Sequence, residues 1–301
     1  MKYKFIIKPP LKKELEREIL NFGKKEKVEV ELTEKGRFSQ KSAKNLAKNA
    51  ILNGFERIIV AGGDGLLNET INGIFEVKEK IPKDFAIGII PKGTGNNFAK
   101  SLSMPKDIKR AFEVIKSDKK ISVDVGKVNG IYFINCFSLG FDAKVNYLAN
   151  EIKEKLQFLP KTLSYFLAAI KEIFAEIPSY EVKIEGKEIN LKSDLSLLAI
   201  TNSQAYGSIF KINPQALISD GKFNLCLISP PKRIEAIKIL FLVIQGKHTG
   251  LKKVKNYLFS LPIKIFLKEK VIWEIDGEVF PPENEFEIEV LPKALSFIAK
   301  Q

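Results

Sequence analysis

The stretch Arg57-Ile-Ile-Val-Ala-Gly-Gly-Asp-Gly-Leu-Leu-Asn-Glu-Thr-Ile-Asn-Gly-Ile-Phe75 decides the fold of this chain. Residues Ile58 to Ala61 have the length and the branched side chains of a buried parallel strand. After a glycine-rich turn, apolar side chains recur at the spacing that lines one face of a helix. These side chains are Leu67, Ile71, Ile74 and Phe75. The stretch therefore predicts a strand, a glycine turn and a helix in immediate succession.

The turn consists of Gly62, Gly63, Asp64 and Gly65. Glycines let backbone N–H groups approach an anion closely, and the N-terminus of a helix adds positive partial charge. A phosphate site and a simple tight turn between strand and helix both fit these glycines. Asp64 favours a ligand site, because a carboxylate would repel bare phosphate but is well placed beside a magnesium-bound nucleotide or a substrate hydroxyl.

A second loop of the same kind follows the apolar run from Phe85 to Ile90. It reads Pro91-Lys-Gly-Thr-Gly-Asn-Asn97 and leads into a short helical pattern. Because ligands bind at the carboxyl edge of an open α/β sheet, the two loops together predict one nucleotide held between them. Neither loop has the pattern Gly-x-x-x-x-Gly-Lys-Ser/Thr. Phe98 stands where the third glycine of the dinucleotide fingerprint would fall.

The chain changes its pattern near residue 121. Up to that point strands and helices alternate, which predicts a parallel sheet with helices on its faces. Beyond it, apolar runs flank Asn129-Gly130, a strong hairpin signal. Further strands are predicted over 182–185, 188–191, 194–201, 222–228, 263–267 and 271–275, with helical segments over 145–177 and 233–245. We therefore predict an α/β N-terminal domain, residues 1–125 with 288–301 returning to it, and a C-terminal antiparallel β-sandwich domain, residues 126–287.

Composition limits the class of partner. The chain has 301 residues, is 45% hydrophobic and carries a net charge of +13. This charge favours ATP or an anionic membrane as a partner. Nucleic acid is not expected, since no basic segment is interleaved with aromatic residues. No signal peptide is evident and no apolar run approaches the roughly 18 residues of a membrane span, so we expect a cytoplasmic protein.

Cysteine and histidine usage narrows the chemistry. Cys136 and Cys226 lie in apolar, strand-like runs and are expected to be buried thiols in a reducing compartment. The single histidine, His248, lies in a basic stretch near a glycine and is expected at the surface. With one histidine in the chain, acid–base catalysis falls to carboxylates.

An ordered set of motifs resembles the catalytic family of diacylglycerol kinases and sphingosine kinases, in particular its bacterial lipid kinase branch. The first two motifs are Gly62-Gly63-Asp64-Gly65-x-x-Asn68-Glu69 and Ile89-Ile90-Pro91-x-Gly93-Thr94-Gly95-Asn96-x-Phe98-Ala99. They are followed by Asp124-Val125-Gly126, Gly140-Phe141-Asp142-Ala143, Ala216-Leu217-Ile218-x-Asp220-Gly221 and Asp276-Gly277-Glu278. The resemblance covers nearly the whole chain, in the order that the family has.

The resemblance implies a fold like that of NAD kinases and diacylglycerol kinases, with ATP in a cleft between two domains. It implies transfer of the γ-phosphoryl group of ATP to the hydroxyl of a diacylglycerol-like lipid. The residues that it places at the nucleotide are Thr33, Gly62, Gly63, Asp64, Gly65, Leu66, Leu67, Asn68 and Thr94.

The same resemblance assigns the catalytic and metal positions. Glu278 is implied as the general base, with Asp64 and Asp124 as further catalytic carboxylates. A Mg²⁺ site is implied at Leu217, Asp220 and Lys222, from one carboxylate and two main-chain carbonyls. Hard Mg²⁺ with few protein oxygens suits such a donor set.

Three positions depart from the family pattern. Leu66 replaces a threonine of the phosphate loop, and Asn97 replaces an aspartate. The loop Lys8-Pro9-Pro10-Leu11 does not reproduce the usual first loop. Each lost charged hydrogen bond is worth about 1.5–3 kcal/mol, so these changes would lower activity by one or two decades without abolishing it.

Alternatives to an ATP-dependent lipid kinase are a soluble NAD-kinase-like enzyme and a nucleotide-binding member of the family with reduced or lost catalysis. The basic surface and the segment 156–177 predict reversible attachment to an anionic membrane, at the inner face, though an ordinary core helix fits the segment equally well. A monomer and a homodimer both fit the sequence.

Overall fold

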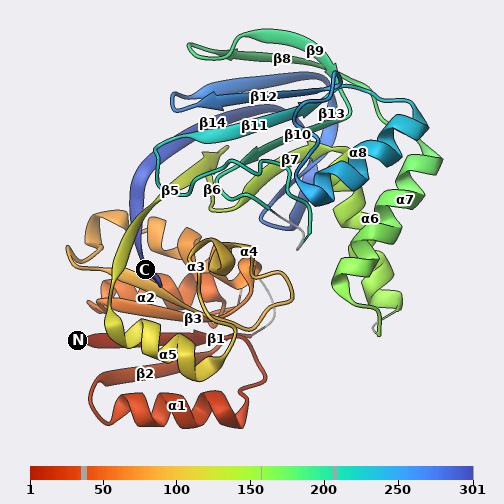
Figure 1. The fold of residues 1–301 in the computed structure, drawn as a ribbon. Coiled ribbons are helices and arrows are strands. Elements are labelled where there is room, and N and C mark those ends of the chain that lie inside the picture. Colours follow the sequence, from red (N-terminus) through yellow and green to blue (C-terminus); the bar gives the residue numbers. More distant parts are fainter. Residues whose placement is uncertain (35–38, 157, 206–208, 301) are drawn as a thin grey trace. The chain divides into compact units, whose positions relative to one another are not determined.

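The computed structural model describes residues 1–34, 39–156, 158–205 and 209–300. The chain divides into two compact units. Unit 1 comprises Met1–Val123 and Lys293–Gln301, and unit 2 comprises Asp124–Pro292. Figure 1 shows the elements of both, and each unit is described by itself.

Unit 1 is built on a parallel sheet. Its strand order is β2–β1–β3–β4. The end of β14 lies on the other side of β4, where Phe297 pairs with Ile87 of β4. The bounds are β1 Lys2–Ile7, β2 Lys27–Leu32, β3 Arg57–Gly62 and β4 Ala86–Pro91, with β14 spanning Glu278–Ile298. Every residue of β3 and β4 is buried, which is why both read as continuous apolar runs.

Helices cover both faces of this sheet (Figure 1). They are α1 Lys13–Gly23, α2 Ala43–Leu52, α3 Asp64–Phe75, the short α4 Asn97–Ser101 and α5 Ile108–Ser117, with a single 3₁₀ turn at Lys78–Lys80. On the face of α1 and α5, the rings of Phe5, Phe22 and Phe112 pack within 6.0 Å of one another. The apolar stripes of the helices and strands thus meet in one core.

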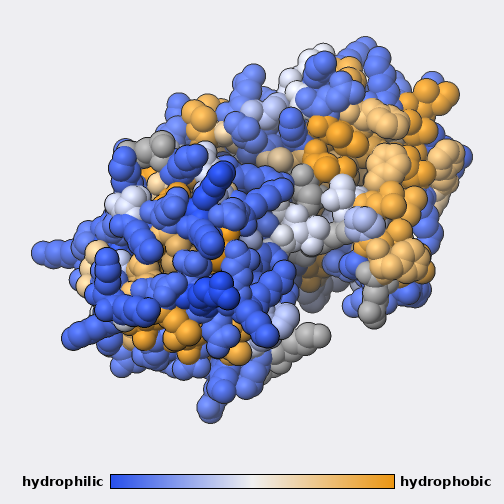
Figure 2. Space-filling view, turned by 60° about the horizontal axis from the view of Figure 1, so that its bottom comes forward, coloured by the Kyte–Doolittle hydropathy of each residue, from blue (hydrophilic) through white to orange (hydrophobic). Residues whose placement is uncertain are grey.

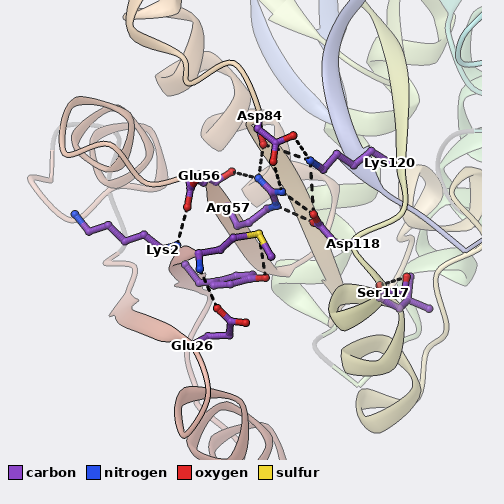
Figure 3. Close-up of polar contacts among 11 residues, drawn as sticks. Lys2, Glu26, Glu56, Arg57, Asp84, Ser117, Asp118 and Lys120 are labelled. Carbon is purple, nitrogen blue, oxygen red and sulfur yellow. Dashed lines mark hydrogen bonds and ion pairs between the residues drawn. The ribbon is translucent and has the colours of Figure 1, made fainter.

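A buried arginine ties the amino ends of β3 and β4 together (Figure 3). Arg57 is fully buried and donates to Asp118 at 2.7 and 2.6 Å and to Asp84 at 2.9 Å. Lys120 also contacts Asp84, at 2.5 Å. Hydrogen bonds from Lys120 and Arg57 lower the pKa of Asp84 to about 2. Burial acts to lower the pKa of Arg57, but its hydrogen bonds to Asp118 and Asp84 outweigh this and raise it.

Unit 2 is mainly antiparallel. Its strands are β5 Lys120–Val128, which enters the unit at Asp124, then β6 Ile131–Phe133, β7 Cys136–Gly140, β8 Tyr180–Gly186, β9 Leu191–Leu195, β10 Leu197–Thr201, β11 Phe223–Ile228, β12 Val254–Phe259 and β13 Ile263–Ile275, followed by β14. The order β12–β11–β10–β7–β13–β14 forms the main sheet, and β8 and β9 extend from β13. The parallel α/β N-terminal part and the antiparallel C-terminal part confirm the predicted fold class.

The sheet of unit 2 separates two apolar cores. In β10, Leu198 and Ile200 face a core inside the strands, and Leu197 and Ala199 face a core under the helices. This is the alternation of a strand with both faces buried. The helices are α6 Phe141–Lys155, α7 Lys161–Ala175 and α8 Arg233–Gln245, and they lie together on one side of the strands (Figure 1).

Several predicted elements differ in their bounds. The predicted strand 194–201 is two strands, because β9 ends at Leu195 and β10 begins at Leu197. The predicted strands 263–267 and 271–275 are one strand, β13, with register shifts after Phe266. The helical segment 145–177 is divided near Pro160 into α6 and α7, since proline cannot continue a helix. Strand β12 was not predicted.

The expected surface position of His248 is wrong. Its side chain is fully buried, and its Nε2 atom lies 2.9 Å from the carbonyl oxygen of Ile212. Burial lowers the pKa of His248. Cys136 and Cys226 are buried free thiols, as expected. Among the described residues, no helix combines the length and apolarity needed to span a bilayer.

Candidate active site

The two glycine loops of unit 1 lie against each other at the carboxyl ends of β3 and β4. A Cβ atom on Gly93 would lie 2.6 Å from the Cα atom of Gly63, and backbone cannot yield at that distance. The N–H of Lys92 donates to the carbonyl of Gly62 at 2.9 Å. Glycine is therefore required where the loops touch, and the loops form one continuous surface.

Asp64 joins the two loops. Its Oδ2 atom accepts from the N–H of Asn97 at 3.0 Å, and its Oδ1 atom accepts from the N–H of Phe98 at 3.1 Å. These are the first N–H groups of α4, where positive partial charge favours a carboxylate. Asp64 thus fastens the second loop to the start of α3, a role that its sequence context did not suggest.

Asn96 closes the second loop on itself. It adopts a left-handed backbone with φ 48°. Its Oδ1 atom accepts from the N–H of Gly93 at 2.9 Å, and its Nδ2 atom donates to the carbonyl of Gly93 at 2.6 Å. Thr94, between these residues, is exposed. Its hydroxyl group is accordingly open to a ligand at the tip of the loop.

The ends of β1 and β2 lie at the same edge of the sheet. Thr33 follows β2, and its N–H donates to the carbonyl of Ile7 at 2.9 Å. The atypical first loop is held by Lys92, whose ammonium donates to the carbonyls of Lys8 at 3.3 Å and Pro10 at 3.1 Å. Burial lowers the pKa of Lys92, with a smaller effect from Lys12. The loop 8–11, which departs from the family pattern, is therefore held in place by Lys92.

Leu66, Leu67 and Asn68 are buried at the start of α3. Leu66 packs on Gly62, because a Cβ atom there would lie 2.4 Å from its side chain. The leucine that replaces the usual threonine thus fills the space beside β3. Contact between a ligand and Leu66 or Leu67 would be through their main-chain atoms.

In unit 2, Asp124 is fully buried and bound to the loop 218–221. Its Oδ2 atom accepts from the N–H of Gly221 at 2.7 Å, and its own N–H donates to the carbonyl of Ile218 at 2.9 Å. This is the segment at which the family resemblance implies a metal site. The structure therefore brings Asp124 next to Leu217, Asp220 and Lys222, of which the last two lie on either side of Gly221.

Asp276 and Gly277 form a two-residue hairpin between β13 and β14, with φ 49° and 90°. Positive φ at both residues is the type I′ geometry. The carboxylate of Asp276 accepts three backbone N–H groups, from Ile134 at 3.0 Å and from Asn135 and Cys136 at 2.9 Å. The hairpin is thus pinned to the start of β7, and Glu278 follows it with an exposed side chain.

Three residues that the sequence did not single out connect Asp124 to this hairpin. The Nδ2 atom of Asn202 donates to the carbonyl of Asp124 at 2.7 Å, and the N–H of Asn202 donates to the carbonyl of Asn135 at 2.9 Å. The Oγ atom of Ser203 donates to the Oδ1 atom of Asn135 at 3.2 Å. Asn202 and Ser203 could have been found from sequence, because they are polar residues that directly follow the buried strand β10.

The sequence-predicted site residues thus form two groups. Thr33, the loop 62–68 and Thr94 belong to unit 1, and Asp124, the loop 217–222 and Glu278 belong to unit 2. Among the residues that the structure describes, no group of three or more His, Cys, Asp or Glu could hold a metal. The implied Mg²⁺ site uses one carboxylate and two main-chain carbonyls, so it does not require such a group.

Comparison with known proteins matches both parts of the chain. Residues 10–128 match the model of the diacylglycerol kinase catalytic domain, and residues 135–299 match that of the YegS C-terminal NAD kinase beta sandwich-like domain. A diacylglycerol kinase of Staphylococcus carnosus is 35% identical over 234 residues, 77% of this chain and 73% of that protein. A diacylglycerol kinase of Bacillus subtilis is 30% identical over 237 residues, 78% of this chain and 75% of that protein.

Solved structures agree on the fold. A diacylglycerol kinase from Bacillus anthracis superposes with a TM-score of 0.78 at 21% identity, over 99% of this chain and 97% of that one. An NAD kinase from Archaeoglobus fulgidus in complex with ATP superposes with a TM-score of 0.53 at 14% identity, over 99% and 94%. With both domain models matched in order and relatives above 30% identity, the chain belongs to the family of bacterial diacylglycerol kinases.

Proposed function

We propose that this protein is an ATP-dependent kinase that phosphorylates the hydroxyl of a diacylglycerol-like lipid. The observation that carries the proposal is the contact of the two glycine loops at Gly63 and Gly93, in a chain of this family. Phosphoryl transfer is catalysed mainly by positioning and by charge stabilisation. The loop surface and the N-terminus of α3 supply donors for phosphate oxygens, and Thr94 adds a hydroxyl.

The lipid hydroxyl is the nucleophile. Its oxygen attacks the γ-phosphorus, the bond from that phosphorus to the bridging oxygen breaks, and ADP leaves. Glu278 accepts the hydroxyl proton. Its exposed carboxylate and its place after a pinned hairpin suit this role, since a base must be held at a fixed position. Asp124 is tied to the hairpin that precedes Glu278 through Asn202 and Asn135.

We assign Mg²⁺ to Asp220 with the main-chain carbonyls of Leu217 and Lys222. The donor set fits, because it is all oxygen with one carboxylate and leaves room for waters. Asp220 is exposed, and its Oδ1 atom accepts from the N–H of Lys222 at 3.1 Å, which keeps the loop tightly turned. Bound there, Mg²⁺ would supply positive charge for the reaction.

We also propose that nucleotide binding belongs to residues 1–125 with 288–301, and lipid and metal binding to 126–287. We also propose that unit 2 attaches peripherally to the inner face of an anionic membrane, and its apolar surface supports this proposal. Figure 2 shows hydrophobic surface gathered on the side where α6, α7 and α8 lie. Its exposed residues include Phe158, Leu163, Leu167, Phe174, Ile234 and Phe241.

A radiolabelled-ATP assay tests the proposed function. Wild-type protein is mixed with diacylglycerol, monoacylglycerol, a sphingoid base and NAD, the lipids in mixed micelles. We expect label in diacylglycerol and dependence on Mg²⁺. Label in NAD alone would indicate the NAD-kinase-like reading, and ATP binding without any labelled acceptor would indicate a family member that has lost catalysis.

A further inference from the structure

The side chain of Lys92 crosses the carboxyl end of β3. Its N–H group donates to the carbonyl of Gly62, and its ammonium donates to the carbonyls of Lys8 at 3.3 Å and Pro10 at 3.1 Å. Strand β3 lies between β4, which Lys92 follows, and β1, which Lys8 follows. The methylenes of the lysine therefore extend across the start of the first glycine loop, and the ammonium lies between that loop and the loop 8–11.

This ammonium has no acidic partner in the part of the chain that the structure describes. Both of its acceptors are main-chain carbonyls, and no carboxylate forms an ion pair with it. An ammonium group has three N–H donors, so one donor remains after the two carbonyls. The side chain is half-buried, and burial, followed by the charge of Lys12, lowers the pKa of Lys92. An anion that accepts the remaining donor would stabilise this cation.

The groups around this donor are those that the proposed function assigns to phosphate. On one side are the backbone N–H groups of the first glycine loop and the N-terminus of α3. On the other side is Thr33, whose N–H donates to the carbonyl of Ile7 at the end of β1. A cation, main-chain N–H groups without side chains and a helix N-terminus together suit an anion with several oxygen atoms, such as the phosphates of a nucleotide.

We propose that Lys92 binds a phosphate oxygen of the nucleotide with the donor that the loop 8–11 leaves free. The inference rests on the proposed function and adds a cation at a position that the motif Pro91-x-Gly93 leaves unspecified. Two departures from the family pattern then have a common reason. Leu66 removes a hydroxyl donor from the phosphate loop, and the carbonyls of the loop 8–11 hold a charged donor nearby. Charged hydrogen bonds are about twice as strong as neutral ones, so one ammonium can replace that hydroxyl.

The first test compares ligands that differ only in their phosphates. ATP, ADP and adenosine are titrated by calorimetry into wild type, Lys92→Gln and the control Lys109→Gln. Glutamine keeps an N–H donor for the loop 8–11 but lacks the charge. The control removes the same charge from an exposed position on α5. We expect Lys92→Gln to weaken binding of ATP and ADP by about tenfold or more and to leave adenosine unchanged. Lys109→Gln should bind all three like wild type.

Two results of this test would overturn the proposal. Equal losses for ATP and adenosine in Lys92→Gln would show that the lysine only holds the loop 8–11. Equal ATP affinity in Lys92→Gln and Lys109→Gln would place the phosphates elsewhere. Lys92→Arg keeps the charge and should bind ATP more tightly than Lys92→Gln, and thermal melting monitors the folding of each variant.

The second test needs no variant. Wild-type protein is treated with limiting acetic anhydride, which acylates neutral amines, and the modification of each lysine is read by mass spectrometry. Saturating ADP should slow acetylation of Lys92 several-fold, because a bound phosphate covers the amine and favours its protonated form. Saturating adenosine should not, and neither should inorganic phosphate at the concentration of ADP. Lys109 is the internal reference. Equal protection by adenosine, or protection by inorganic phosphate, would overturn the proposal.

These failures are separable from failure of the proposed function. If the protein phosphorylates lipid while Lys92→Gln binds ATP like wild type, the function stands and the assignment of Lys92 falls. If nucleotides bind with the expected dependence on Lys92 but no lipid is phosphorylated, the assignment stands and the proposed function falls. Wild-type protein that binds no nucleotide would contradict both.

Discussion

At the scale of single residues, Glu278 is the carboxylate that we propose as the general base. We expect Glu278→Gln to lower kcat by about 10²–10⁴, because the amide keeps the shape of the side chain but cannot accept the hydroxyl proton. Affinity for ATP should stay near the wild-type value. The measurement is lipid phosphorylation together with calorimetric ATP binding.

The matched control for this variant is Glu285→Gln, an exposed glutamate on the same strand. It should retain wild-type kcat. If Glu278→Gln also phosphorylates lipid at the wild-type rate, another group takes the proton.

At Gly93 the proposed nucleotide site leaves no room for an added methyl group. In Gly93→Ala the new Cβ atom would lie 2.6 Å from the Cα atom of Gly63, so the loops must separate. We expect ATP affinity to fall at least tenfold, about 1.4 kcal/mol. Gly250→Ala is the control, since a Cβ atom there meets nothing within 4 Å. Equal ATP affinity in the two variants would place the nucleotide elsewhere.

At the scale of elements, the ion cluster of Arg57 joins β3, the approach to β4 and the end of α5. Removal of Arg57 takes away a fully buried guanidinium, while Lys120 remains as a partner of Asp84 and Asp118. We expect Arg57→Met to lower the free energy of unfolding by about 1.5–3 kcal/mol, the usual value for hydrogen bonds to charged groups, measured by urea denaturation. Arg110→Met, an exposed arginine on α5, should stay within about 0.5 kcal/mol of wild type. A loss for Arg57→Met no larger than that of the control would mean that the cluster is not stabilising.

Helices α7 and α8 carry the expected membrane contact. Each presents apolar residues at helical spacing to solvent, Leu163, Leu167 and Phe174 on α7 and Ile234 and Phe241 on α8. We expect Leu163→Glu combined with Phe174→Glu to reduce co-sedimentation with anionic vesicles at least fivefold, because charged side chains oppose insertion at the interface. Leu20→Glu, an exposed leucine on α1, should bind like wild type. Binding that depends on neither salt nor anionic lipid would indicate ordinary core helices.

The fold class could be predicted from the sequence, but some contacts of the candidate site could not. The fold class followed from sequence because β3 and β4 are buried on both faces and because Asn129-Gly130 has an unambiguous turn chemistry. The link from Asp124 through Asn202 and Asn135 to Asp276 did not follow, since it joins residues from separate strands whose pairing no local pattern encodes. The prediction for His248 was wrong for a similar reason, because its buried ring contacts Ile212, a residue distant in sequence.

At the scale of the whole molecule, stability should depend on pH through Glu274. Burial, and next the charge of Asp142, raise its pKa in the folded protein, whereas in the unfolded chain it is about 4.3. The folded state therefore holds a proton that the unfolded state releases, and its contribution to stability declines as pH rises above about 4.3. We expect wild type to lose free energy of unfolding relative to Glu274→Gln between pH 5 and pH 8, measured by urea denaturation. A difference between the two proteins that does not change with pH would show that Glu274 is charged in the folded state.

The path of β14 has a consequence for the synthesis of the protein. The strand runs from unit 2 into unit 1, where Phe297 pairs beside β4 and its ring lies 4.9 Å from that of Phe98. Unit 1 is thus begun by residues 1–123 and completed by residues 293–300. Residues 124–292 are made in between, which takes about 10 to 30 s at ordinary elongation rates. During that interval the outer edge of β4 has no neighbouring strand. Its backbone N–H and C=O groups at that edge are unpaired until β14 has been made.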